Sequence, residues 1–147
     1  WSEAKSDILD KINSTAKQEG VEDRVFYHGY KPVGPELFAY YKLADIYLIA
    51  SQASEGFPRT IWEAMAHSLP VVATRVGSIP DFIEGVAELV EPRDPTALAQ
   101  SVKKLIDDSE LRKKYIARAF EIAKENTLET QVEKMSHEII QWVEENR

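Results

Sequence analysis

The sequence predicts an α/β fold in which helices cover both faces of a parallel β-sheet. Two observations carry this prediction. Segments of strand length alternate with helical segments along the chain, and the strand segments are almost continuously apolar. Strands that alternated between apolar and polar residues would instead indicate a sheet with one face in water. The predicted layout is that of a Rossmann-like domain, whose ligands bind beyond the carboxyl ends of the strands.

Four short runs rich in β-branched, aliphatic and aromatic residues are predicted as strands, because turn residues such as glycine and proline bound them. These runs are residues 25–27, 46–49, 71–74 and 87–90. Helices are predicted where apolar residues recur every three or four positions or where a helix start signal is present. The helices cover residues 2–19, 35–43, 59–67, 79–83, 95–107, 110–124 and 128–145. Asp94 is a plausible N-cap, because Pro95 follows it at the first helical position.

Composition limits the class of protein. A chain of 147 residues with 44% apolar side chains can form a single domain with a sizeable core. The net charge of −7 gives no electrostatic footprint for nucleic acid, so we expect no nucleic-acid partner. The absence of cysteine excludes thiol catalysis, disulfides and thiolate metal sites, and it fits a reducing compartment.

The ends of the sequence indicate a piece of a longer protein. The chain begins without methionine and opens directly into a helical pattern, so we expect an N-terminal truncation. It has no apolar run near the roughly 20 residues of a membrane span and no signal-peptide layout. We therefore expect a cytoplasmic location, which leaves membrane association of the full-length protein open.

The segment after the second predicted strand combines two carboxylates with a helix start. Glu55 and Gly56 stand in the loop, and Glu63 lies on the helix that follows. Backbone amides near Arg59 and Thr60, together with the helix dipole, favour a phosphate there. Carboxylates accept hydrogen bonds from vicinal hydroxyls, so this layout suits a sugar nucleotide. The spacing alone leaves open that both glutamates are merely solvated surface acids.

These residues resemble the Glu-x7-Glu signature of the retaining glycosyltransferases of family 4. That family has the GT-B fold, in which two Rossmann-like domains face each other. Flanking segments with the family's order extend the resemblance over nearly the whole chain. These segments are residues 24–30, 44–45, 69–74, 77–81 and 90–98. The resemblance implies that this chain is the C-terminal, nucleotide-sugar-binding domain of such an enzyme.

The resemblance also assigns roles in the loop after the second strand. It makes Glu55 the catalytic carboxylate that contacts hydroxyls of the donor sugar. It places the backbone of Gly56, Phe57 and Pro58 beneath the sugar and the diphosphate. Gly56 suits this role because glycine lets a ligand approach the backbone closely.

The remaining donor-binding residues follow from the same resemblance. It makes Glu63 the acid that binds the ribose hydroxyls and places Arg59 and Thr60 beside the diphosphate. Tyr30 and Lys31 resemble the stretch whose backbone meets the base. The family implies no metal or other cofactor, because basic side chains and helix amides stabilise the leaving diphosphate. The substrate is a nucleotide-diphosphate sugar.

The chain departs from the family pattern in several places. Ser68 stands where the family usually has glycine, and a left-handed backbone there would cost about 1 kcal/mol. The basic pair that grips the diphosphate and the acceptor-binding N-terminal domain both lie outside this sequence, so we expect the isolated chain to be inactive. In the family the last helix crosses toward that partner domain, although packing is the simplest prediction for the apolar stripe of residues 139–143.

The sequence thus predicts the donor-binding domain of a retaining glycosyltransferase of polysaccharide biosynthesis, acting on a saccharide or lipid-linked acceptor. One alternative is another GT-B sugar enzyme, such as a phosphorylase or an epimerase, which generally lacks this pair of glutamates. A second is a non-catalytic α/β binding module of the receiver type. That module needs an acidic residue after an early strand, whereas Asp45 precedes its strand. His28, His67 and His137 are scattered over three elements, so no metal site is predicted.

Overall fold

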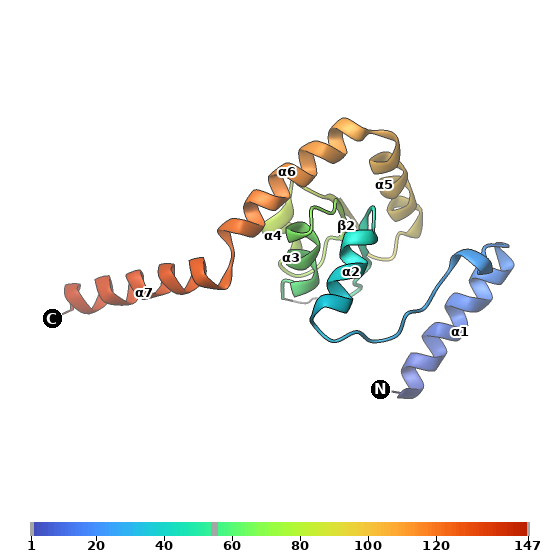
Figure 1. Ribbon diagram of the computed structural model, residues 1–147, viewed down its shortest axis with the longest axis horizontal. Helices are drawn as coiled ribbons and strands as arrows, with labels where there is room; N and C mark the ends of the chain where they lie inside the picture. Colours follow the sequence, from blue (N-terminus) through green and yellow to red (C-terminus); the bar gives the residue numbers. More distant parts are fainter. Residues whose placement is uncertain (1, 54–55, 147) are drawn as a thin grey trace. The chain divides into compact units, whose positions relative to one another are not determined.

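The computed structural model describes residues 2–53 and 56–146 (Figure 1). The chain forms two compact units, Trp1–Leu37 and Phe38–Arg147. Its helices and strands, in chain order, are α1 (Ser2–Gln18), the 3-10 helix η1 (Glu22–Arg24), α2 (Pro35–Leu43), β1 (Tyr47–Ile49), α3 (Arg59–Ala66), β2 (Val71–Thr74), α4 (Ile79–Ile83), β3 (Glu88–Val90), α5 (Pro95–Asp107), α6 (Ser109–Glu125) and α7 (Leu128–Glu145).

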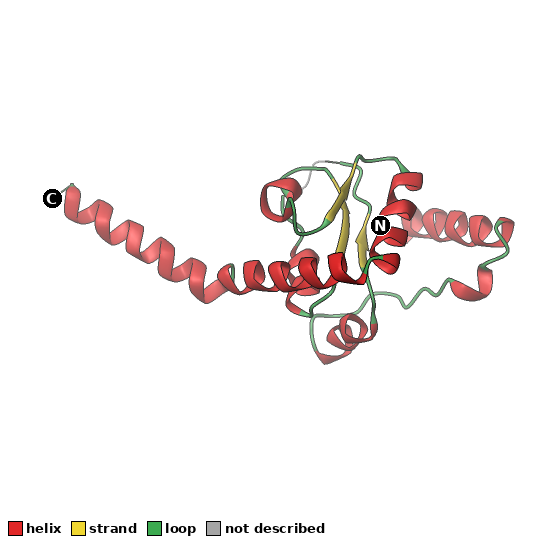
Figure 2. Ribbon diagram, turned by 90° about the horizontal axis from the view of Figure 1, so that it is seen from above, coloured by secondary structure: helices red, strands yellow, loops and turns green. Residues whose placement is uncertain are grey.

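The second unit contains a three-stranded parallel sheet in the order β1-β2-β3 (Figure 2). In its register Leu48 lies beside Val72, and Val72 beside Glu88. All four residues of the central strand β2 are buried. Helices α3 and α5 pack against β2, which explains why its first three residues are all apolar. The α/β fold class predicted from the alternation of elements is confirmed.

The prediction of a strand at residues 25–27 is wrong. Val25 has an extended backbone, with φ −111° and ψ 116°, but Phe26 and Tyr27 are exposed. An extended segment becomes a strand only when a neighbouring strand satisfies its backbone groups. Among the described residues, pairing joins only β1, β2 and β3. The other three predicted strands are present, two of them one residue shorter at the start than expected.

The predicted helices are all present, and two local predictions about their ends are confirmed. The Asp94 carboxylate accepts a hydrogen bond from the Ala97 amide at 2.8 Å, as an N-cap of α5 should. Ser68, just beyond α3, has a φ of 60°. Its amide donates to the Met65 carbonyl at 3.0 Å, so the chain reverses sharply there before β2.

The core of the second unit lies between the sheet and its helices. Ile61 and Met65 of α3, Ile79 and Ile83 of α4, and Leu105 of α5 have at most 1% of their surface exposed. Burying side chains of this size contributes roughly 1.5–3 kcal/mol each. The core therefore fixes the inner face of α3, so the opposite face of this helix is held in a defined orientation.

The apolar stripe of α7 does not pack against the rest of the unit. The large apolar side chains of this helix are all at least 45% exposed; they are Leu128, Val132, Met135, Ile139, Ile140, Trp142 and Val143. Figure 1 shows α7 continuing beyond α6. The prediction that residues 139–143 pack within this chain is therefore wrong for the described residues.

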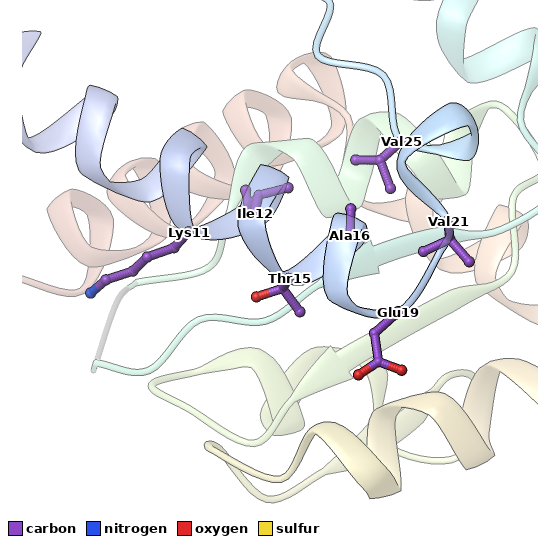
Figure 3. Close-up of a pocket in the computed structure, with 7 residues that line it drawn as sticks. All are labelled: Lys11, Ile12, Thr15, Ala16, Glu19, Val21 and Val25. Carbon is purple, nitrogen blue, oxygen red and sulfur yellow. The ribbon is translucent and has the colours of Figure 1, made fainter.

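In the first unit, one face of α1 borders an open groove of about 390 Å³ (Figure 3). Lys11, Ile12, Thr15, Ala16 and Glu19 of α1 line it, together with Val21 and Val25. Ala16 is buried, whereas Ile12 is 44% exposed. The spacing of four that predicted α1 thus corresponds to this face of the helix.

Candidate nucleotide-sugar site

The site is built around the start of α3, directly after the loop that follows β1. Pro58 adopts φ −64° and ψ 120°, and the helix begins at Arg59. The Ile61 amide donates to the Pro58 carbonyl at 3.0 Å, whereas the amides of Arg59 and Thr60 have no acceptor within the helix and form a partly positive surface that suits an anion. Gly56 is exposed in the preceding loop, and a Cβ placed there would meet open space. This leaves room for a ligand against the backbone.

Of the two predicted glutamates, Glu55 and Glu63, the structure describes Glu63. Its side chain is only 14% exposed, and each of its two oxygens has a partner. The Arg59 Nε lies 2.9 Å from Oε1, and the Tyr41 hydroxyl donates to Oε2 at 2.9 Å. The Arg59 side chain is 73% exposed, so the ion pair lies at the surface. Glu55 lies outside the described residues, and its convergence with Glu63 stays a prediction.

A second hydrogen bond connects β1 to the start of α3. The Tyr47 hydroxyl donates to Thr60 Oγ1 at 2.6 Å. Thr60 was predicted beside the diphosphate, and this contact fixes its side chain one residue after the helix start. Burial, followed by the hydrogen bond to Glu63, raises the pKa of Tyr41 well above its ordinary value. Tyr41 therefore remains a hydrogen-bond donor even above pH 10, where an exposed tyrosine ionises.

An aromatic cluster supports the loop on its other side. The ring of Phe57 lies 4.5 Å from that of Trp62 and 4.9 Å from that of Phe82, centroid to centroid. Such contacts stabilise by roughly 0.5–1.5 kcal/mol beyond the buried area. Ile61 belongs to the core, whereas Trp62 is half-buried and packs on Phe57. Phe57 is thereby anchored by α3 and α4.

The carboxyl ends of all three strands border a cleft of about 320 Å³. Its lining comes from the last residue of β2 and from the segments that follow β1 and β3: Thr74, Ala50, Gln52, Arg93, Asp94, Pro95 and Leu98. The Thr74 hydroxyl donates to the Ser51 carbonyl at 2.7 Å and so joins the ends of β2 and β1. This edge of the sheet is where a Rossmann-like domain binds its ligand.

The other predicted site residues lie in the first unit. Tyr30 is 82% exposed, and the Lys31 Nζ lies 2.6 Å from a carboxylate oxygen of Glu36. Their role beside the base stays a prediction. The described residues contain no cluster of three or more His, Asp or Glu side chains able to hold a metal ion. Across the same part of the chain, each helix is too short or too polar to cross a bilayer.

Sequence reasoning missed Tyr41 and Tyr47. No motif marks them, because their partners are 22 and 13 residues away and the contacts join different elements. The available signal was weak: a tyrosine on the inner face of a helix that leads into an apolar strand. Buried tyrosines usually find a partner for the hydroxyl.

Comparison with known proteins identifies the family. The model of the family "Glycosyl transferases group 1" matches residues 6–122. The chain belongs to the group 1 glycosyl transferases. A solved C-terminal domain of a group 1 glycosyl transferase from Francisella tularensis superposes with a TM-score of 0.73 at 30% identity, covering 82% of this chain and 62% of that one. This group 1 chain therefore corresponds to the C-terminal, donor-binding domain of the GT-B fold, as the motif resemblance implied.

Two relatives show how the group 1 chain compares in sequence. It is 37% identical over 105 residues to the D-inositol 3-phosphate glycosyltransferase of Corynebacterium glutamicum, covering 70% of this chain and 25% of the relative. It is 35% identical over 112 residues to the N-acetyl-alpha-D-glucosaminyl L-malate synthase of Bacillus anthracis, covering 75% and 28%. The group 1 chain thus spans about a quarter of the length of these relatives.

Proposed function

We propose that this domain binds the nucleotide-diphosphate sugar donor of a retaining glycosyltransferase. The observation that carries the proposal is the Glu63 carboxylate. It is largely buried, held in place through both oxygens, and located one turn into the helix that follows β1. A carboxylate fixed at this position can accept hydrogen bonds from both vicinal hydroxyls of a ribose. The membership of the glycosyl transferase family favours transfer over the phosphorylase, epimerase and binding-module alternatives.

Arg59 is the exchangeable partner of Glu63 in this proposal. Its side chain is 73% exposed, and surface ion pairs contribute at most about 1 kcal/mol. When the donor binds, the guanidinium leaves Oε1 and contacts the diphosphate at the start of α3. A ribose hydroxyl then donates a hydrogen bond to Oε1 in place of the guanidinium. Arg59 thereby supplies positive charge to the leaving diphosphate, together with the amides near Thr60.

The loop before α3 supports the sugar. Glu55 contacts the donor-sugar hydroxyls and is the catalytic carboxylate of the proposal, with the backbone of Gly56, Phe57 and Pro58 beneath it. The rings of Trp62 and Phe82 hold Phe57 in place. A fixed Phe57 helps to position the anomeric carbon, and positioning accounts for much of the rate of a transfer reaction.

The rest of the reaction depends on the full-length protein. The acceptor is proposed only as a class, a saccharide or a lipid-linked acceptor. The two relatives described above are named for small acceptors outside that class, inositol 3-phosphate and L-malate. Because the chain spans about a quarter of those relatives, we expect the isolated chain to transfer no sugar to any acceptor. Turnover by the purified chain would contradict this expectation.

The roles of the two glutamates are tested by titrating the full-length protein with UDP, GDP, ADP and dTDP and with the matching glucose donors. For the nucleotide that binds, Glu63→Ala should weaken the free nucleotide and the intact donor alike by about ten- to a hundredfold, corresponding to roughly 1.5–3 kcal/mol. Glu55→Ala should spare the free nucleotide and lower donor turnover. These roles are wrongly assigned if both variants lose the same free-nucleotide affinity. They are also wrongly assigned if neither variant loses any.

A further inference from the structure

Tyr41 is the buried partner of Glu63 and comes from a different element. It lies in the last turn of α2, and only 7% of its surface is exposed. Its ring stacks on that of His67 at 5.2 Å and lies 6.1 Å from that of Tyr47. The ring is therefore fixed by contacts on α3 and β1, and its hydroxyl reaches Glu63 Oε2 at 2.9 Å.

The two partners of Glu63 differ in how firmly they are held. Arg59 belongs to the same helix as Glu63 and extends into solvent, so its side chain can rotate away at little cost. Tyr41 has two side-chain torsions, is buried, and contacts the rings of His67 and Tyr47, so its hydroxyl has little freedom to move. Tyr41 is thus the partner that stays when Arg59 moves.

We propose that Tyr41 is a positioning residue for nucleotide binding, because it fixes the Glu63 carboxylate in the rotamer that meets the ribose hydroxyls. This inference rests on the proposed role of Glu63. Without the tyrosine hydroxyl, the carboxylate would rotate freely once Arg59 left, and ribose binding would have to order it. Ordering a flexible side chain on binding weakens affinity.

The test compares variants of the full-length protein by isothermal titration with UDP, GDP, ADP or dTDP, whichever binds. Tyr41→Phe keeps the packed ring and removes only the hydroxyl. It should raise the Kd for the nucleotide three- to tenfold and raise the donor KM similarly, while kcat stays within twofold. In a Glu63→Ala background, Tyr41→Phe should have no additional effect on Kd, since its action passes through that carboxylate.

Tyr115→Phe is the matched control. The Tyr115 hydroxyl donates to Glu88 Oε1 at 3.1 Å, so this variant also removes one tyrosine–glutamate hydrogen bond, but at the first residue of β3. It should lower the melting temperature about as much as Tyr41→Phe and leave Kd unchanged. An unchanged Kd in Tyr41→Phe would overturn the proposal. So would an equal fold-change in Kd when Tyr41→Phe is made in the wild type and in the Glu63→Ala variant. If Glu63→Ala itself leaves Kd unchanged, the proposed role of Glu63 fails first.

Discussion

Two glutamates of the second unit have nearly the same surroundings but lie on different structural elements, Glu63 within α3 and Glu88 at the start of β3. Glu63 accepts a hydrogen bond from Tyr41 at 2.9 Å, and Glu88 accepts one from Tyr115 at 3.1 Å. Their side chains are 14% and 12% exposed. In both cases a tyrosine from another helix holds a largely buried carboxylate.

Each of these carboxylates also meets one exposed cation. Arg59 lies 2.9 Å from Glu63, and Lys104 lies 2.8 Å from Glu88. The difference is one of position: Glu63 follows the carboxyl end of β1, whereas Glu88 begins β3 at its amino end. Ligands of parallel sheets bind at the carboxyl ends of the strands. The local chemistry of a buried glutamate is therefore a poor guide to binding, and its place on the sheet is a better one.

The largest expected effect separates the two glutamates directly. Glu63→Gln should weaken nucleotide-diphosphate binding by the full-length protein about tenfold or more, because a neutral amide accepts hydroxyl hydrogen bonds less strongly than a carboxylate. Glu88→Gln should leave that affinity unchanged while lowering the melting temperature. Titration and thermal unfolding of both variants would measure this. Loss of affinity in Glu88→Gln would break the comparison.

A smaller effect is expected from the two cations. Arg59→Gln should weaken the nucleoside diphosphate about three- to tenfold, because the diphosphate loses a charged partner. The Arg59→Gln variant should bind the nucleoside without phosphates at least as tightly as the wild type does, because no guanidinium competes with the ribose for Glu63 Oε1. Lys104→Gln should change neither affinity. Titrations with nucleoside and nucleoside diphosphate measure both arms, and parallel weakening of the two ligands by Arg59→Gln would contradict the exchange of partners.

The smallest effect is a shared dependence of stability on pH. Burial first, and then the hydrogen bond from each hydroxyl to its glutamate, raises the pKa of Tyr41 and of Tyr115 above the ordinary value of 10.0. A pKa raised by folding means that the stabilisation is fully present below pH 10 and is lost as the pH rises above it. Urea unfolding between pH 8 and 11 should show a shallower decline for Tyr41→Phe and for Tyr115→Phe than for the wild type. Identical slopes in all three proteins would contradict this.

The sequence predicted what depends on local pattern. The helices, the three paired strands and the Asp94 cap follow from periodicity and capping, and the left-handed backbone at Ser68 follows from the motif resemblance. The segment 25–27 has strand composition, but composition does not supply the neighbouring strand that pairing needs. Tyr41 was missed for a related reason, since its role depends on a contact across 22 residues. Glu55 lies outside the described residues, so half of the predicted glutamate pair is untested.

The aromatic cluster beside the loop has a spectroscopic consequence. Of the two tryptophans that the structure describes, Trp62 is the one whose indole contacts the ring of Phe57, with the centroids 4.5 Å apart. Trp142 is 63% exposed on α7, so its emission should be that of an indole in water. A change in the position of Phe57 alters the environment of Trp62, because indole emission responds to the polarity of its surroundings. The protein thus carries a native fluorophore against the backbone that is proposed to lie under the donor sugar, and Trp142→Phe would leave its signal easier to isolate.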